Sequence, residues 1–177
     1  MKKTLLLGLS FLVFSTSGLA QAPRVGEPAP GFSLPYATKD SISKVPLQLS
    51  DIVGTANIVL AFYPADWSTG CTKEVCTLRD DFSNLEALNA TVLGISGDYV
   101  WSHYAWAKHH NLPFRLLSDH RHDVARAYNS FNEQSNFTRR AIFVINRKGE
   151  IAYVDLEYSV ADSLDFGRLK QALGSIR

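Results

Sequence analysis

The pattern of apolar positions along the chain predicts strands that alternate with helices. Residues 58–63, Ile-Val-Leu-Ala-Phe-Tyr, form a continuous apolar run that ends at Pro64, which fits a strand buried on both faces. Over residues 72–88 the apolar side chains recur at spacings of three and four, which is the period of an amphipathic helix. The alternation continues along the chain, with strands predicted over 91–96 and 114–117 and helices over 100–110 and 123–128.

The two ends of this pattern complete an α/β fold. Residues 140–145 and 150–155 are apolar segments on either side of an Asn-Arg-Lys-Gly turn, so we expect them to pair as a hairpin before a last helix over 165–176. Short alternating segments at 32–34 and 47–49 predict a small hairpin or a pair of edge strands. Strands that alternate with helices predict one α/β domain, a three-layer sandwich with a mixed sheet and an N-terminal extension.

The beginning of the chain has the pattern of an export signal. Two lysines precede an apolar run at residues 5–14, and Gly18 and Ala20 then occupy the −3 and −1 positions of a small-residue cleavage site. The run is shorter than the roughly 20 apolar residues of a membrane span. We therefore expect a signal peptide over 1–20, a single mature domain over 21–177 without stable membrane insertion after cleavage, and a periplasmic or secreted location.

Charge and cysteine content narrow the classes of function. The 177 residues include 18 Lys and Arg against 17 Asp and Glu, a net charge of +1, so the chain lacks the basic footprint of a nucleic-acid-binding protein. Two cysteines are too few for a disulfide-scaffolded mini-protein. In an oxidising compartment, however, a pair of cysteines needs a chemical or structural explanation.

Both cysteines lie in one stretch after the predicted strand at 58–63. Cys71 is expected in the first turn of the following helix, where unpaired N–H groups and the helix dipole favour a negatively charged, nucleophilic thiolate. Cys76 lies five residues later, about 140° further round a helix. Five helical residues rise about 7.5 Å, whereas a disulfide needs Cα atoms within roughly 7 Å. Either the two cysteines never pair or the first turns of this helix unwind to join them.

The residues around the cysteines resemble a known active site. Pro64, Ser68 and Cys71 stand at the spacings of the Pro-x3-Thr-x2-Cys pattern of the peroxiredoxins. Cys76 matches the second cysteine, and Glu74 the frequent glutamate, of the bacterioferritin-comigratory or Q-type subgroup of the alkyl hydroperoxide reductase/thiol-specific antioxidant family. The resemblance covers about residues 25 to 155, where Gly-Ile-Ser-Gly-Asp at 94–98 and Phe-Arg-Leu-Leu-Ser-Asp at 114–119 continue it and Arg140 falls on the family's active-site arginine.

This resemblance implies a thioredoxin-like fold and a peroxidase reaction. A Cys71 thiolate would attack a peroxide and become a sulfenic acid, Cys76 would condense with it to a disulfide, and a thioredoxin-like dithiol protein would reduce that disulfide. Arg140 would hold the thiolate and the peroxide, the Ser68 hydroxyl would bond the sulfur, and Pro64 would close the rim of the pocket. The reaction needs no organic cofactor and no metal, and we expect a monomer or weak homodimer.

The stretch also departs from the family pattern in ways that leave alternatives open. Ser68 replaces the family's Thr, and Thr69 replaces the subgroup's Pro, so either residue is a candidate for the active-site hydroxyl. Asp66 is a neighbour whose charge could oppose a thiolate. Strand alternation sends Arg139 and Arg140 to opposite faces, and a shift of one residue would exchange them.

Three other interpretations compete with a peroxidase. A thioredoxin-like thiol–disulfide oxidoreductase should carry Cys-x2-Cys and a proline before the late strand, whereas this chain has Cys-x4-Cys and Arg140. A copper- or metal-binding module could use the histidines, which we expect instead on a solvated helix end and loop. A purely structural disulfide conflicts with the helical geometry between the cysteines. The five histidines are His103, His109, His110, His120 and His122.

Overall fold

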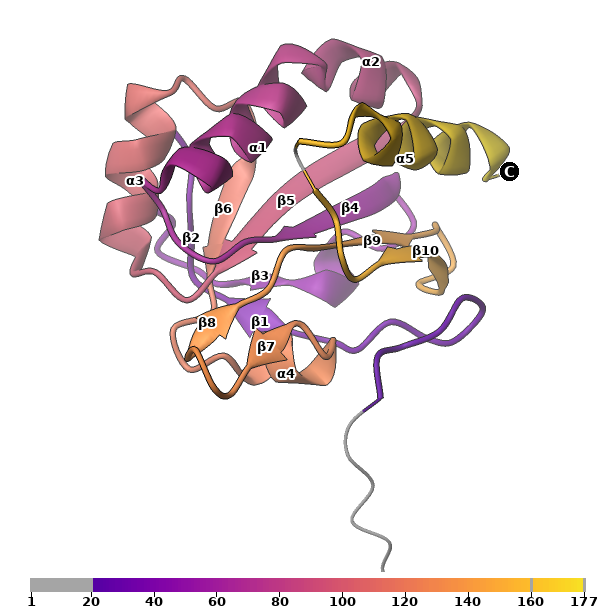
Figure 1. Ribbon diagram of the computed structural model, residues 1–177, viewed down its shortest axis with the longest axis horizontal. Helices are drawn as coiled ribbons and strands as arrows, with labels where there is room; N and C mark the ends of the chain where they lie inside the picture. The colour runs from indigo at the N-terminus through magenta and orange to yellow at the C-terminus, as the bar shows by residue number, and fades with distance from the viewer. Residues whose placement is uncertain (1–20, 160, 177) are drawn as a thin grey trace, which may run out of the picture.

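The computed structural model describes residues 21–159 and 161–176. Its centre is a six-stranded sheet with the order β10-β9-β4-β5-β6-β2 (Figure 1). Strands β4, β5 and β6 are parallel, whereas β9, β10 and β2 are antiparallel to their neighbours, so the sheet is mixed as predicted. The strands are β2 (Tyr36–Ala37), β4 (Asn57–Phe62), β5 (Ala90–Ser96), β6 (Arg115–Ser118), β9 (Ala141–Ile145) and β10 (Ile151–Asp155).

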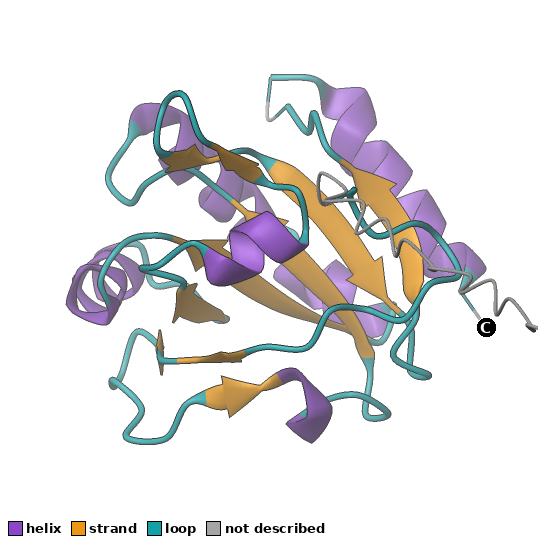
Figure 2. Cartoon of the chain, turned by 90° about the horizontal axis from the view of Figure 1, so that it is seen from below, coloured by secondary structure: helices purple, strands orange, loops and turns teal. Residues whose placement is uncertain are grey.

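Two apolar layers cover the sheet because the side chains of its strands alternate between the faces. In β4, Val59 and Ala61 join one buried cluster, and Ile58 and Leu60 join the other. Helices cover the first face, and shorter elements cover the second (Figure 2). The first face carries α1 (Thr69–Asp80), α2 (Phe82–Ala87), α3 (Val100–His109) and α5 (Ser163–Ser175). The second carries α4 (Asp123–Ala127), the 3-10 helix η1 (Leu49–Asp51), and the strand pairs β1 (Ser33–Leu34) with β3 (Leu47–Gln48) and β7 (Phe131–Asn132) with β8 (Phe137–Thr138).

The predicted three-layer α/β sandwich, the pairing of the segments at 32–34 and 47–49 as β1 with β3, and the late hairpin β9–β10 are thus confirmed. The β1–β3 pair is a sheet of its own, and the edge strand of the main sheet on that side is β2. The helix predicted over 72–88 is wrong in two respects, since it begins at Thr69 and breaks at Asp81 into α1 and α2. Asp81 leaves helical geometry at φ −103° and ψ 12°, and its side chain accepts a hydrogen bond from Asn84 Nδ2 at 2.6 Å. Such side chains compete with the backbone and favour helix ends.

The predicted signal peptide lies outside the described residues. Within the part of the chain that the structure describes, no helix is long and apolar enough to cross a membrane.

Candidate active site

Cys71 is the third residue of α1 and is fully buried. Ser68, directly before the helix, is extended at φ −72° and ψ 142°, and its carbonyl accepts the first helical bond from Thr72 N at 2.9 Å. The Cys71 side chain packs into the apolar cluster between α1 and the sheet. Its position in the first helical turn is the one predicted, among backbone N–H groups that favour a negative charge.

Arg140 lies directly before β9 and reaches this sulfur. Strand β9 pairs with β4 in a register that sets Ala141 opposite Phe62, so Arg140 comes beside the loop that leads into α1. Arg140 Nη1 donates to Cys71 Sγ at 3.3 Å. Arg139 is exposed, whereas the guanidinium of Arg140 contacts the sulfur, so the structure removes the ambiguity in the sequence.

The same guanidinium binds the carboxylate of Glu74, one turn further along α1. Arg140 Nη1 donates to Glu74 Oε2 at 2.6 Å, and Glu74 is fully buried. Burial raises the pKa of Glu74 from its usual 4.5 to about 7, although Arg140 pulls it down. Burial alone would lower the pKa of Arg140, but Glu74 and Cys71 beside it outweigh burial and raise it. The guanidinium therefore stays charged next to the sulfur.

Gly70 provides the space for this arrangement. A Cβ at Gly70 would lie 2.7 Å from Arg140 Nη2, closer than a side chain tolerates. The sequence shows this glycine next to Cys71, but nothing in its pattern says that an arginine from a distant strand fills the space beside it. Gly70 is therefore a site residue that sequence reasoning missed.

Asp66 fixes the loop between β4 and α1. Its buried carboxylate accepts hydrogen bonds from Tyr63 OH at 2.8 Å and Ser102 Oγ at 2.7 Å, and lies 2.9 Å from His103 Nδ1. Burial, followed by the nearby Asp66, raises the pKa of Tyr63 well above its usual value, so its hydroxyl remains a donor. The Asp66 backbone N–H donates to Asp98 Oδ2 at 2.8 Å. The loop is thus tied to α3 and to the residues that follow β5.

This network corrects the expectation that Asp66 opposes the thiolate, and it includes a buried histidine. The Asp66 carboxylate is occupied by partners on Tyr63 and α3, so it anchors the loop instead of opposing Cys71. His103, which belongs to neither of the expected surface pairs of histidines, is fully buried in α3. His103 Nε2 lies 3.1 Å from the Leu117 carbonyl, which is an acceptor only, so this ring nitrogen carries a proton.

Cys76 lies on a different side of α1, as the helical spacing predicted. Its sulfur is 3.9 Å from His110 Nδ1, at the end of α3. Both cysteines are free thiols in the structure. Among the described residues, no group of three or more His, Cys, Asp or Glu side chains could hold a metal ion.

A family model supplies the comparison that decides the identity. The AhpC/TSA family model matches residues 25–154. The chain belongs to the AhpC/TSA family. Its relatives place it among the Bcp or Q-type peroxiredoxins, which are thiol-dependent peroxidases. This confirms the resemblance drawn from residues 64–76 and Arg140.

The similarity of this peroxiredoxin to its relatives extends over most of the domain. It is 38% identical over 136 residues to "Putative peroxiredoxin bcp" of Coxiella burnetii, covering 73% of this chain and 86% of that protein. It is 34% identical over 133 residues to "Peroxiredoxin Bcp" of Bacillus subtilis, covering 72% and 81%. The crystal structure of peroxidoxin BcpB from Mycobacterium tuberculosis superposes with a TM-score of 0.76 at 28% identity, covering 88% of this chain and 99% of that one. The thioredoxin-like peroxiredoxin fold is therefore confirmed.

The hydroxyl groups of the peroxiredoxin motif, unlike the arginine, make no hydrogen bond to Cys71 among the described residues. Ser68 Oγ donates to the Ala65 carbonyl at 3.2 Å, so its described partner is the backbone of its own loop and not Cys71. Thr69 is exposed at the start of α1, and Pro64 is half-buried, two residues after the end of β4. The structure thus brings together Cys71, Arg140 and Glu74, while a sulfur contact for Ser68 or Thr69 stays a prediction.

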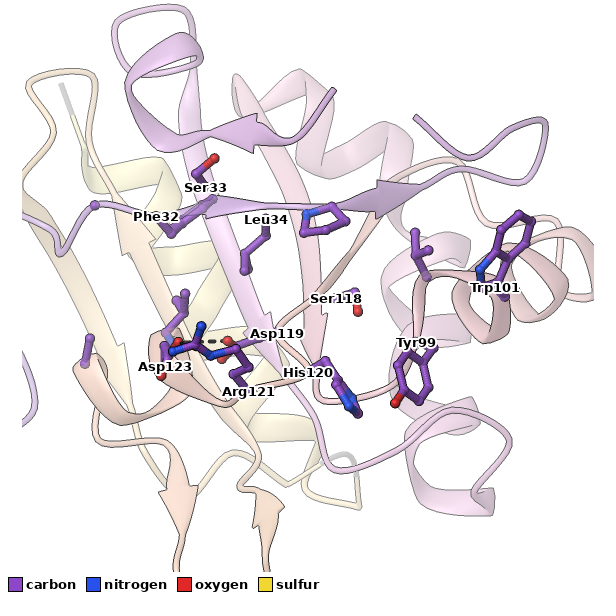
Figure 3. A pocket seen from close by; sticks show the side chains of 15 residues that line it. Phe32, Ser33, Leu34, Tyr99, Trp101, Ser118, Asp119, His120, Arg121 and Asp123 are labelled. Atoms are coloured by element: carbon purple, nitrogen blue, oxygen red, sulfur yellow. Dashed lines mark hydrogen bonds and ion pairs between the residues drawn. The ribbon is translucent and has the colours of Figure 1, made fainter. Parts of the chain in front are cut away.

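A cavity of about 630 Å³ lies elsewhere on the peroxiredoxin, between the β1–β2 segment, the start of α3 and the β6–α4 loop. Figure 3 shows Tyr99 beside His120 at its rim and the Arg121–Asp123 ion pair along one side. Its lining does not include Cys71 or Arg140. This cavity is therefore separate from the Cys71 site.

Proposed function

We propose that this peroxiredoxin is an exported enzyme that reduces hydrogen peroxide or organic hydroperoxides through Cys71, with Cys76 as the resolving thiol. The observation that carries the proposal is the 3.3 Å contact between Arg140 Nη1 and the buried Cys71 sulfur in the first turn of α1. A fixed positive charge and a helix N-terminus both favour the thiolate at this position. The thiolate is the form of cysteine that attacks a peroxide.

The first step is a displacement at the peroxide oxygen–oxygen bond. The Cys71 thiolate attacks one oxygen, a sulfur–oxygen bond forms, and the oxygen–oxygen bond breaks. The departing oxygen leaves as water or an alcohol after it gains the proton that the thiol had released. Arg140 supports this step because its charge lies beside the sulfur, and its N–H groups can donate to an oxygen that gains negative charge there.

In the second step, the Cys71 sulfenic acid and the Cys76 thiol form a disulfide and release water. Cys71 and Cys76 belong to one continuous helix, whose rise of about 7.5 Å over five residues exceeds the span of a disulfide. The first turns of α1 must therefore unwind, which withdraws Val75 from the core and separates Glu74 from Arg140. The loss of a few hydrogen bonds and of this packing costs a few kcal/mol, which disulfide formation can offset.

An external dithiol protein returns both cysteines to thiols by thiol–disulfide exchange. We propose a thioredoxin-like reductant. The unwound helix supports this, because it exposes both sulfurs to a partner that the folded helix would exclude.

The proposal is tested with the reduced mature protein and one equivalent of peroxide, followed by thiol counts and intact mass. The parent should lose two thiols rapidly, Cys71→Ser should lose none, and Cys76→Ser should accumulate a sulfenic or more highly oxidised Cys71. Retention of both thiols in the parent would contradict the proposal. Reduction of insulin without peroxide consumption would favour a thiol–disulfide oxidoreductase. Tight copper binding without turnover would favour a metal-binding module.

The location and the assembly state are separate proposals. The lysine-led apolar segment within residues 1–20 supports export to the periplasm or beyond. Expression of the full chain in a Gram-negative host should yield a periplasmic protein that begins at residue 21, and a cytoplasmic protein of full mass would overturn export. We propose a monomer or weak homodimer, and sedimentation across a concentration series measures this.

A further inference from the structure

His110 is the ionisable side chain that contacts the second cysteine. Cys76 is half-buried on α1, and its sulfur lies 3.9 Å from His110 Nδ1, within hydrogen-bonding reach for sulfur. His110 caps the C-terminal end of α3, a different element from the helix that must unwind. The base and the thiol therefore meet across two elements, only one of which changes in the reaction.

Several contacts hold the His110 ring in this position. Arg79 Nη1, from α1, donates to the His110 carbonyl at 2.9 Å. The ring of His110 lies edge-on to Trp106, with 5.9 Å between ring centroids, and to His109, with 4.7 Å. The tilted ring of Trp67 lies 6.3 Å from His110 and 5.5 Å from His109. Since Trp106 is fully buried, one side of the histidine is backed by the core. The ring thus faces Cys76 from a fixed support.

The groups around His110 favour its neutral form. Burial lowers the pKa of His110, and the neighbouring His109 and Arg79 lower it further. From α1 the ring faces Cys76 and Arg79, whose charge is paired with Asp80, and from its own helix it faces His109. A neutral imidazole nitrogen beside a thiol is a proton acceptor at neutral pH.

We propose that His110 is the general base of the resolving step, an inference that rests on the proposed role of Cys76. His110 Nδ1 takes the Cys76 thiol proton, and the resulting thiolate attacks the sulfur of the Cys71 sulfenic acid. A sulfur–sulfur bond forms, the sulfur–oxygen bond breaks, and the hydroxide leaves as water after gaining a proton. His110 then returns its proton to solvent, so the step consumes one sulfenic acid and one thiol and yields one disulfide and one water.

The half-buried position of His110 suits this cycle. The ring is shielded enough for its pKa to fall, yet it keeps access to water for the proton that it collects. When α1 unwinds, the thiolate departs toward Cys71 while His110 stays on α3. Deprotonation can therefore precede the movement and make the arriving sulfur ready to attack.

The test compares His110→Asn with its neighbour control His109→Asn in the full mature chain. Asparagine keeps a polar group near the Nδ1 position but cannot act as the base. Each protein is mixed with peroxide, quenched in acid at short times, and analysed by mass for sulfenic acid and for the Cys71–Cys76 disulfide from about pH 5 to about pH 9, a range that spans the usual pKa of histidine. Consumption of peroxide in the first turnover reports Cys71 chemistry and verifies that each variant is folded.

In His110→Asn, disulfide formation at neutral pH should slow by about tenfold to a hundredfold, with sulfenic acid formation unchanged. In the parent, the rate of disulfide formation should fall at acid pH as His110 becomes protonated and should level off above the pKa of His110. In His110→Asn, this rate should instead rise with pH over the whole range. In His109→Asn the fall in rate at acid pH should remain. It should occur at slightly higher pH, because one group that lowers the pKa of His110 is gone. Added imidazole should restore part of the rate in His110→Asn.

Equal disulfide rates and equal pH profiles in the two variants would overturn the role of His110 while leaving Cys76 as the resolving thiol. If instead the parent forms no Cys71–Cys76 disulfide, the proposed function itself fails, and the inference fails with it.

Discussion

Gly70 and Arg140 fit together so closely that a methyl group on the glycine would lie 2.7 Å from Nη2 of the arginine. The guanidinium crosses the first turn of α1 through the space that Gly70 leaves, and there it contacts Cys71 and Glu74. The reactive sulfur and its positive neighbour thus depend on a residue that has no functional group. The site needs a glycine at position 70 to leave room for Arg140, whereas the helix alone would be more stable with alanine there.

Gly70→Ala should slow the reaction with peroxide without loss of stability. Alanine is favoured over glycine in a helix by about 0.5–1 kcal/mol, which offsets the looser contact between the displaced Arg140 and Glu74, so the folded state should be about as stable as the parent. The displaced Arg140 should lower the rate of sulfenic acid formation by about tenfold to a hundredfold. Rapid-mixing kinetics and thermal unfolding measure the two effects.

Gly167→Ala on α5 is the matched control, because a Cβ there meets nothing within 4 Å. It should show the gain in helix stability expected of alanine and an unchanged rate. Equal peroxide rates in both alanine variants would show that Gly70 does not position Arg140.

Arg140→Lys tests whether charge alone is sufficient. Lysine keeps the charge but not the flat guanidinium, whose Nη1 contacts both Glu74 and Cys71 while Nη2 fills the space beside Gly70. We expect the rate of Cys71 oxidation to fall by about a hundredfold. The same substitution at the exposed neighbour, Arg139→Lys, should leave the rate unchanged, and a similar loss in both would argue against a specific contact.

The sequence was sufficient for the elements whose apolar pattern is long. The run at 58–63 predicted the buried strand β4, and the position of Cys71 at the start of the next helix followed from it. The sequence missed the two-residue strands β2, β7 and β8, whereas β1 and β3, of the same length, lie inside the longer alternating segments at 32–34 and 47–49. The break at Asp81 was hidden because the apolar spacing continues through it.

The site was predictable where a residue's chemistry matches a motif, and not where a distant partner gives it its role. Cys71, Glu74 and Arg140 were named from the resemblance, but the pairing of β9 with β4 was needed to show that Arg140 and not Arg139 faces the sulfur. Asp66 appeared in the sequence as an unfavourable charge. Its partners on α3 are more than 30 residues away, so the spacing in the motif could not reveal an anchor.

Glu74→Gln should change how stability depends on pH. Burial raises the pKa of Glu74 from 4.5 to about 7, so the folded state holds a proton that the unfolded chain releases. This contribution to stability is complete below the unfolded value and is lost as pH rises through about 7. Glutamine cannot ionise, so the variant does not lose this stability. The difference in free energy of unfolding, variant minus parent, should rise by on the order of 1–3 kcal/mol from about pH 5 to about pH 8.

Urea unfolding under reducing conditions measures this difference across the pH range. Glu86→Gln on α2 is the control, since Glu86 is exposed and its replacement should leave the pH dependence of the parent. A constant difference between Glu74→Gln and the parent at every pH would mean that Glu74 has an ordinary pKa in the folded protein.

Asp66→Asn should destabilise the protein and slow its chemistry together. Asparagine offers one acceptor oxygen where the carboxylate serves Tyr63, Ser102 and His103, and it leaves buried polar groups without a charged partner. Breaking such a buried network costs about 3 kcal/mol or more. Because the Asp66 loop leads directly into α1, the peroxide rate should also fall.

The exposed residue Asp40 provides the comparison for this last prediction. Asp40 pairs with Lys39 at the surface, and its side chain is 74% exposed, so Asp40→Asn should change the free energy of unfolding by less than about 0.5 kcal/mol. Urea unfolding and peroxide kinetics on both variants separate the anchor from a general effect of lost charge. If Asp66→Asn unfolded at the same urea concentration as Asp40→Asn, the carboxylate would not hold the loop. If it lost stability but kept the parent's peroxide rate, the loop would be held without setting the position of Cys71.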